Sequence, residues 1–215
     1  MQIINVDCFQ PNPHAVELAI QTIQNHGVVV VPTETVYGLV CSVFDAEAVT
    51  KIYAIKGRAF TKPLPVFFNS INQIKSILGA NNVPDLAVKL FERFAPGPLT
   101  IVLNCGDALP ESITGKSKTV GIRIPRNPLI LDIINKTNLP LASTSANLSD
   151  KPSHTDAKEV IAELGDQIDL ILDAGVCGSG KPSTVIDLTT EQPKVLREGE
   201  ILITQINAIL GIQNS

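Results

Sequence analysis

The sequence predicts an α/β domain in which helices flank a twisted β-sheet. Segments with helical periodicity alternate with short apolar segments along the 215 residues. Hydrophobic residues make up 44% of the chain and charged residues 18%, so the chain can bury a sizeable core. No internal repeat, low-complexity tract or clear linker interrupts this alternation, and we therefore expect one domain over residues 1–215.

The first half of the chain carries clear start and stop signals. Pro13 suits the first turn of a helix over 11–27, and Gly27 suits its stop. Asp45 and Ser70 are of the types that cap helix N-termini. The run "VVVV" predicts a short, fully buried strand. The expected helices are 11–27, 45–57, 70–78 and 84–94, and the expected strands are 28–31, 64–68 and 99–103.

The second half continues the pattern. Pro128 suits the first turn of a helix, and "TDAKEVIAELG" begins with capping residues. The strand "TVGIRIP" alternates, which turns Arg123 away from the face of Ile122 and Ile124. The expected helices are 127–138, 155–165 and 204–211, and the expected strands are 119–125, 140–144, 168–173, 183–188 and 194–198.

Polar residues follow two of the apolar strands. "PTETVYGL" places Thr33 and Thr35 directly after "VVVV", at the strand end where open α/β sheets bind ligands. "LASTSANLSDKPS" supplies hydroxyls and an amide that can donate to phosphate or ribose oxygens. The alternatives are an ordinary turn for the first segment and a hydrophilic loop for the second.

Basic residues gather in "KGRAFTKP", which holds Lys56, Arg58 and Lys62. Gly57 allows a bend there, and phosphate suits such cations because it accepts charge-assisted bonds. The alternative is a solvated helix end. Arg123 lies in a predicted strand, where it can either bind a carboxylate with two hydrogen bonds or face solvent. Arg197 lies at the end of the predicted strand 194–198, and the alternative to a role in binding is that it is a solvated residue at the edge of the sheet.

Composition argues against several classes of protein. The net charge of −4 argues against non-specific nucleic-acid binding. The four cysteines form no C-x-x-C pair and predict free thiols, and the three histidines form no metal or nucleophile–base spacing. We find no secretory signal and no apolar run of the ~20 residues that span a bilayer, so we expect a cytoplasmic protein without membrane contact.

Taken together, these segments resemble the YrdC/TsaC family of threonylcarbamoyl-adenylate synthases. The family signature, K-x-R followed far downstream by S-x-N, is met by Lys56, Arg58, Ser145 and Asn147. The blocks "PTETVYGL", "PGPLT", "STSANLS" and "PSTVIDL" occur in the family order, between about Val28 and Arg197. The resemblance implies a YrdC-like fold, a twisted open mixed sheet flanked by helices, in the short single-domain form.

The resemblance also implies an activity, a nucleotidyltransferase reaction. L-threonine, bicarbonate and ATP condense to threonylcarbamoyl-AMP and pyrophosphate, and the product serves the threonylcarbamoyladenosine modification of tRNA. ATP acts as a substrate with Mg²⁺, without a dedicated protein metal site, and Lys56 and Arg58 are the implied catalytic residues. Those implied to bind ATP are Lys56, Arg58, Lys62, Thr119, Ser145, Asn147, Ser153 and Arg197. Those implied to bind threonine are Thr35, Phe67, Arg123, Ser143 and Ser183.

Partners and rival functions follow from the same resemblance. The implied partners are the proteins of the tRNA threonylcarbamoyl-transferase complex, with at most a weak RNA contact. Ala59, Lys62, Phe67 and Asp150 depart from the family pattern. One rival is a paralogue that forms carbamoyl-adenylate without threonine. The other is a non-catalytic RNA-binding or ribosome-associated module, which the acidic balance and the sparse aromatic residues disfavour.

Overall fold

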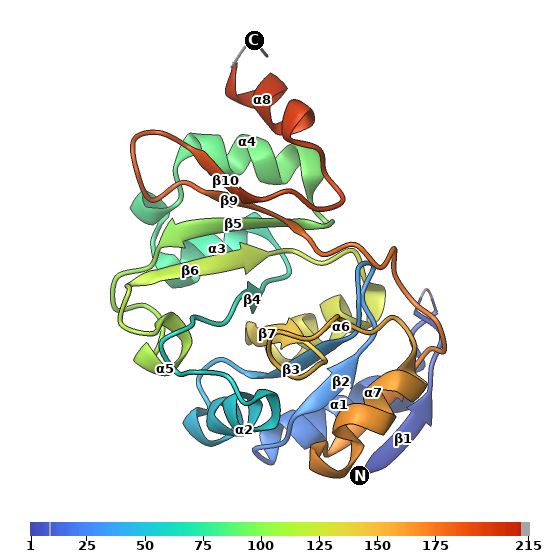
Figure 1. Cartoon of the computed structure of the whole chain (residues 1–215). Helices are drawn as coiled ribbons and strands as arrows, with labels where there is room; N and C mark the ends of the chain where they lie inside the picture. The colour runs from blue at the N-terminus through green and yellow to red at the C-terminus, as the bar shows by residue number, and fades with distance from the viewer. Residues whose placement is uncertain (9, 212–215) are drawn as a thin grey trace.

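The protein is described by a computed structural model that covers residues 1–8 and 10–211. Within these residues, the strands form a ten-stranded sheet in the order β1-β8-β2-β3-β7-β4-β6-β5-β9-β10 (Figure 1). The strands are β1 Gln2–Asn5, β2 Val29–Val31, β3 Gly38–Ser42, β4 Val66–Phe67, β5 Leu99–Asn104, β6 Thr119–Arg123, β7 Leu141–Ser145, β8 Leu170–Asp173, β9 Thr184–Asp187 and β10 Lys194–Arg197.

The sheet is mixed, as predicted. Parallel pairs join β1 to β8, β8 to β2, β4 to β6 and β5 to β9. Antiparallel pairs join β2 to β3, β3 to β7, β7 to β4, β6 to β5 and β9 to β10. Because β4 pairs through two residues only, the middle of the sheet is narrow where β7, β4 and β6 meet.

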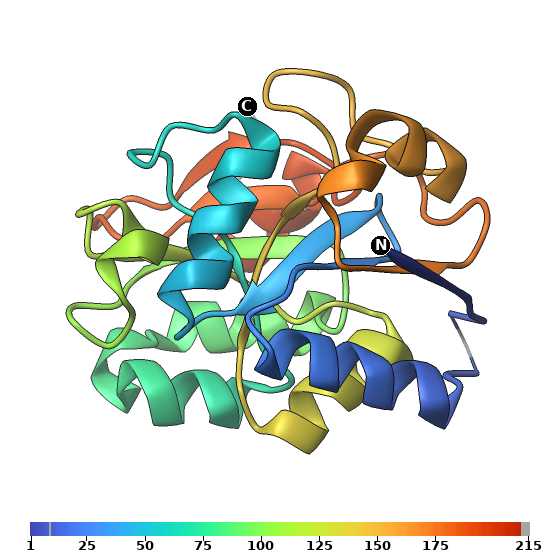
Figure 2. The ribbon, with the colours of Figure 1, turned by 90° about the horizontal axis from the view of Figure 1, so that it is seen from below.

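Helices cover both faces of the sheet. The α-helices are α1 Pro13–Gln24, α2 Ala46–Lys56, α3 Ile71–Leu78, α4 Asp85–Phe94, α5 Glu111–Thr114, α6 Pro128–Thr137, α7 Ala157–Leu164 and α8 Ile203–Leu210, and two 3-10 turns span Ala80–Asn82 and Gly165–Gln167. In Figure 2, α1, α3, α4 and α6 lie along one face and α2 and α7 along the other. Val29 and Val31 pack with α1 and α6, whereas Val30 belongs to the other buried cluster, as the two-residue period of a strand requires.

Several predicted helix signals are confirmed by the hydrogen bonds. The carboxylate of Asp45 accepts from the amides of Glu47 and Ala48, and the hydroxyl of Ser70 accepts from the amide of Gln73. Gly57 ends α2 in the left-handed conformation, with φ of 58°. The bonds accepted by Asp45 and Ser70 satisfy backbone amides in the first turns of α2 and α3, which have no partner within the helix.

The prediction that Gly27 is the left-handed residue that ends α1 is wrong. His26, not Gly27, adopts the left-handed conformation, with φ of 59°. Gly27 is needed for a close approach instead, because a Cβ there would lie 2.6 Å from the carbonyl oxygen of Thr22. The strands β1 and β3 and the short helix α5 were not predicted from the sequence. Since β3 lies inside "PTETVYGLVCS", the segment read as a turn continues into a central strand.

Candidate functional site

A cavity of about 220 Å³ opens over the narrow middle of the sheet. Seven neighbouring strands or the segments beside them reach it, from β3 through β7, β4, β6, β5 and β9 to β10. Hydroxyl groups and three guanidinium groups dominate its polar lining. The lining residues are Thr33, Thr35, Val36, Tyr37, Gly38, Arg58, Pro65, Phe67, Thr100, Arg123, Ser143, Thr144, Ser145, Ser153, Pro182, Ser183 and Arg197.

The turn after β2 holds its own shape through Thr33. The Thr33 hydroxyl oxygen accepts from the amides of Thr35 and Val36 at 3.0 and 3.2 Å, and it lies 2.7 Å from the Val36 carbonyl oxygen. The Thr35 hydroxyl lies 2.8 Å from the Thr33 hydroxyl, and it accepts from the two terminal nitrogens of Arg123 at 3.2 and 3.1 Å. Thr33 therefore shapes the turn, and Thr35 connects it to the cavity wall.

Arg123 is buried, so the solvent-facing alternative is wrong. Its guanidinium donates to the Gly97 carbonyl and forms an ion pair of 2.9 Å with Glu34, with side chains 7% and 8% exposed. The centre of the guanidinium lies 5.7 Å from the Phe67 ring centroid. The pairing of Glu34 with Arg123 was not predicted from the sequence. The signal that could have found it is an acidic residue in a segment otherwise made of hydroxyl and apolar residues.

Arg58 and Arg197 present cations to the cavity without an ion-pair partner among the described residues. Arg58 donates to the carbonyls of Lys62 and Pro63, and Arg197 donates to the carbonyl and hydroxyl of Ser183. Burial lowers the pKa of both groups, and the charge of Arg123 lowers the pKa of Arg197 further. A cavity that holds two uncompensated guanidinium groups favours an anionic ligand.

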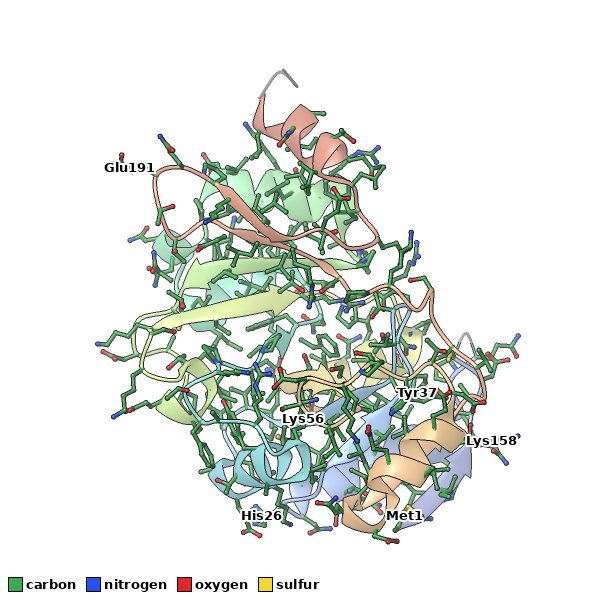
Figure 3. All side chains as sticks on the ribbon, in the orientation of Figure 1. Met1, His26, Tyr37, Lys56, Lys158 and Glu191 are labelled. Atoms are coloured by element: carbon green, nitrogen blue, oxygen red, sulfur yellow. The ribbon has the colours of Figure 1, made fainter. Side chains whose placement is uncertain are left out.

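Lys56 lies behind the cavity wall rather than on it. Its side chain is near the centre of the molecule (Figure 3), and the residue is 3% exposed. The ammonium donates to the carbonyls of Ser145 and Asn147 at 2.6 and 2.7 Å, and the Lys56 carbonyl accepts from the Ser149 amide at 2.9 Å. Burial, with the nearby charge of Arg58, lowers the pKa of Lys56 to about 8. In this way the K-x-R and S-x-N segments are joined through Lys56.

The structure brings most of the predicted site residues together. On the cavity wall it places Thr35, Arg58, Phe67, Arg123, Ser143, Ser145, Ser153, Ser183 and Arg197. Lys62, Thr119 and Asn147 do not line it. The ammonium of Lys62 lies 3.7 Å from the carboxylate of Asp150, Thr119 bonds with Ser117, and the buried Asn147 side chain donates to loop carbonyls. Direct contact of these residues, and of the predicted residues on the cavity wall, with a substrate stays a prediction.

Three further observations concern possible metal ligands, the cysteines and membrane-spanning helices among the described residues. Within residues 1–8 and 10–211, no group of three or more histidine, cysteine, aspartate or glutamate side chains could hold a metal ion. The four cysteines are free thiols, of which Cys41, Cys105 and Cys177 are buried. Over the same residues, no helix combines the length and apolar character that a membrane crossing needs.

Residues 21–199 match the Sua5/YciO/YrdC family model, whose description is "Telomere recombination". The match covers more than half of the chain. The chain belongs to this family. A threonylcarbamoyl-AMP synthase of Bacillus subtilis is 41% identical over 206 residues, which are 95% of this chain and 59% of that protein. The corresponding protein of Pyrococcus abyssi is 38% identical over 91% of this chain and 57% of its own length. The chain thus spans about three fifths of the length of each of these two relatives.

Solved structures of the family have the same fold. The crystal structure of P. abyssi Sua5 complexed with L-threonine matches with a TM-score of 0.92 at 37% identity, over 98% of this chain and 61% of that one. E. coli YciO matches with a TM-score of 0.86 at 28% identity, over 95% of this chain and 98% of that one. The predicted family and the YrdC-like fold are confirmed. HypF, at 19% identity, shares the fold alone, with a TM-score of 0.75.

Proposed function

We propose that the protein is an L-threonylcarbamoyl-AMP synthase, which condenses L-threonine, bicarbonate and ATP to threonylcarbamoyl-AMP and pyrophosphate. The observation that carries this proposal is the pair of uncompensated guanidinium groups, Arg58 and Arg197, which face a hydroxyl-lined cavity. Membership of the family and the naming of its curated relatives support it. The proposal covers residues 1–215 as one YrdC-like domain of a cytoplasmic protein.

The chemistry suits a site without a histidine base. The threonine amine and bicarbonate form a carbamate with loss of water, and a carbamate oxygen then attacks the α-phosphorus as pyrophosphate leaves. The site must hold two anions close together and neutralise the charge that develops on the phosphates. Arg58 and Arg197 supply that neutralisation, and ATP enters as its magnesium complex, with the ion on the phosphate oxygens.

The two substrates divide the cavity in this proposal. Threonine lies against Thr35, Phe67, Arg123, Ser143 and Ser183, and the nucleotide lies against Arg58, Ser145, Ser153 and Arg197 on the cavity wall. The remaining residues of the proposed nucleotide site, which do not line the cavity, are Lys56, Lys62, Thr119 and Asn147. Glu34 already neutralises Arg123. A carboxylate of the substrate therefore shares this guanidinium with Glu34 instead of meeting a free cation. The labile product passes to the proteins of the tRNA threonylcarbamoyl-transferase complex, with at most a weak RNA contact.

An assay with and without threonine tests the function. Purified protein is incubated with ATP, magnesium and labelled bicarbonate, and pyrophosphate and labelled adenylate are measured. We expect both products only when L-threonine is present. Product without threonine would instead indicate a carbamoyl-adenylate synthase, and the absence of any product would indicate a non-catalytic module.

The variant Arg58→Ala tests the proposed phosphate contact. Loss of charge-assisted bonds worth about 1.5–3 kcal/mol each should lower kcat/KM for ATP by about 100-fold or more. The matched control is Arg93→Ala, because Arg93 is an exposed arginine of α4 that does not line the cavity. If Arg58→Ala retained its activity per folded molecule, the role of Arg58 would be structural.

A further inference from the structure

The loop 146–156 joins β7 to α7 and carries Asn147 and Ser153. Ser153 lines the cavity, while Asn147 is buried beside it and belongs to the proposed nucleotide site. Asp150, at the tip of the loop, adopts the left-handed conformation with φ of 65°, which an aspartate holds only at a cost. Within the loop, the Asn147 amide donates to the carbonyls of Leu148 and Lys151, and contacts from outside the loop add to these bonds.

Glu163, on α7, supplies three of these contacts with one carboxylate. One oxygen accepts from the Leu148 amide at 3.1 Å and lies 2.9 Å from Nε2 of His154. The other lies 3.3 Å from the ammonium of Lys151. Burial pushes the pKa of Glu163 upward, but the bonds from His154, Leu148 and Lys151 outweigh it and hold the pKa below its ordinary value. Glu163 is thus an anion with partners along the whole loop.

His154 adds a second fixed point at the end of the loop. Its Nδ1 lies 3.3 Å from a carboxylate oxygen of Glu159, while Nε2 faces Glu163. Both ring nitrogens therefore face carboxylate oxygens of α7, which hold the imidazole in place. The His154 carbonyl also accepts from the amide of Tyr37, which itself lines the cavity. The backbone on one side of Ser153 is thereby fixed.

We propose that Glu163 is a positioning residue for the nucleotide half of the cavity, an inference that rests on the proposed function. Its two shortest contacts are to Leu148 and His154, which directly adjoin Asn147 and Ser153 in the sequence. One carboxylate therefore sets both ends of the loop against the cavity, although Glu163 itself does not line it. The expected effect of losing this anchor is a misplaced nucleotide rather than lost chemistry.

The test compares Glu163→Gln with the matched control Glu159→Gln. Glutamine keeps the size of the side chain but removes the charge that Lys151 and His154 face. The control makes the same change on the same helix, at a side chain that is 59% exposed and contacts only His154 in the loop. Hydrogen exchange of the amides over 147–154 should become about tenfold faster in Glu163→Gln and stay within about twofold of wild type in the control.

Kinetics then separate positioning from stability. In Glu163→Gln, KM for ATP should rise about tenfold, while kcat and KM for threonine change by less than about threefold. His154→Asn removes the partner instead of the carboxylate and should give the same pattern, so the proposal can still be tested if Glu163→Gln does not fold. Unchanged exchange would refute the anchor, and faster exchange with an unchanged KM for ATP would refute the positioning role. If the wild type made no adenylate, the proposed function would fail, and the exchange experiment would still decide whether Glu163 anchors the loop.

Discussion

Replacing Lys56 with methionine should change how the free energy of unfolding depends on pH. The folded chain lowers the pKa of Lys56 from 10.5 to about 8, chiefly through burial. Between these two pH values the unfolded chain binds more protons than the folded chain, so wild-type stability contributed by this group rises with pH. The gap corresponds to about 3 kcal/mol between pH 8 and 10.5.

Two opposing effects set the result at pH 7. Methionine removes a buried charge, which favours the variant by about 3 kcal/mol. It also leaves the carbonyls of Ser145 and Asn147 without their donor, at about 1–3 kcal/mol each. We therefore expect the stability of the variant at pH 7 to lie between about 1 kcal/mol above and about 3 kcal/mol below that of wild type, so the diagnostic quantity is the change with pH.

Urea titrations followed by circular dichroism at several pH values provide the measurement. Subtracting the variant from wild type cancels the titration of all other groups and should leave a difference that grows by about 3 kcal/mol from pH 8 to 10.5. The control is Lys51→Met on the same helix, where the side chain is 41% exposed. A flat difference, or one that shrinks with pH, would show that the carbonyl bonds hold the ammonium more strongly than burial penalises it.

Further predictions concern stability at other positions. Glu34→Gln breaks the ion pair with Arg123, whose side chains are 8% and 7% exposed, so the free energy of unfolding measured by urea titration should fall by about 3 kcal/mol. A fall of less than about 1 kcal/mol would contradict the pairing. Thr184→Val removes a buried hydroxyl that donates to the carbonyl of Ile201 and accepts from the amides of Gly199 and Ile201, at a cost of about 2–3 kcal/mol in the same assay, and an unchanged midpoint would refute this. Asp150→Gly relieves a φ of 65° and should raise stability by about 0.5 kcal/mol, seen as a higher Tm; a lower Tm would mean that the Asp150 carboxylate stabilises the loop.

Local signals in the sequence predicted most of the helices and the mixed α/β class. They did so because caps such as Asp45 and Ser70 act within one turn of their own residue. The failures occurred where a close approach of the backbone or the pairing of strands decides. Gly27 was read as a helix stop, yet its role depends on the approach of its backbone to Thr22. The strand β3 was missed because its pairing with β2 and β7, rather than its own pattern, makes it a strand.

The candidate site divides in the same way. Residue type and spacing predicted the alternation of helices and strands and the segments that carry cations and hydroxyls, and the motifs in these segments resembled those of the family. Only the tertiary structure decided which cations are compensated. It pairs Arg123 with Glu34, buries Lys56 against two carbonyls and leaves Arg58 and Arg197 facing the cavity. Charge compensation depends on distances and burial between strands far apart in the chain, which local sequence patterns do not encode.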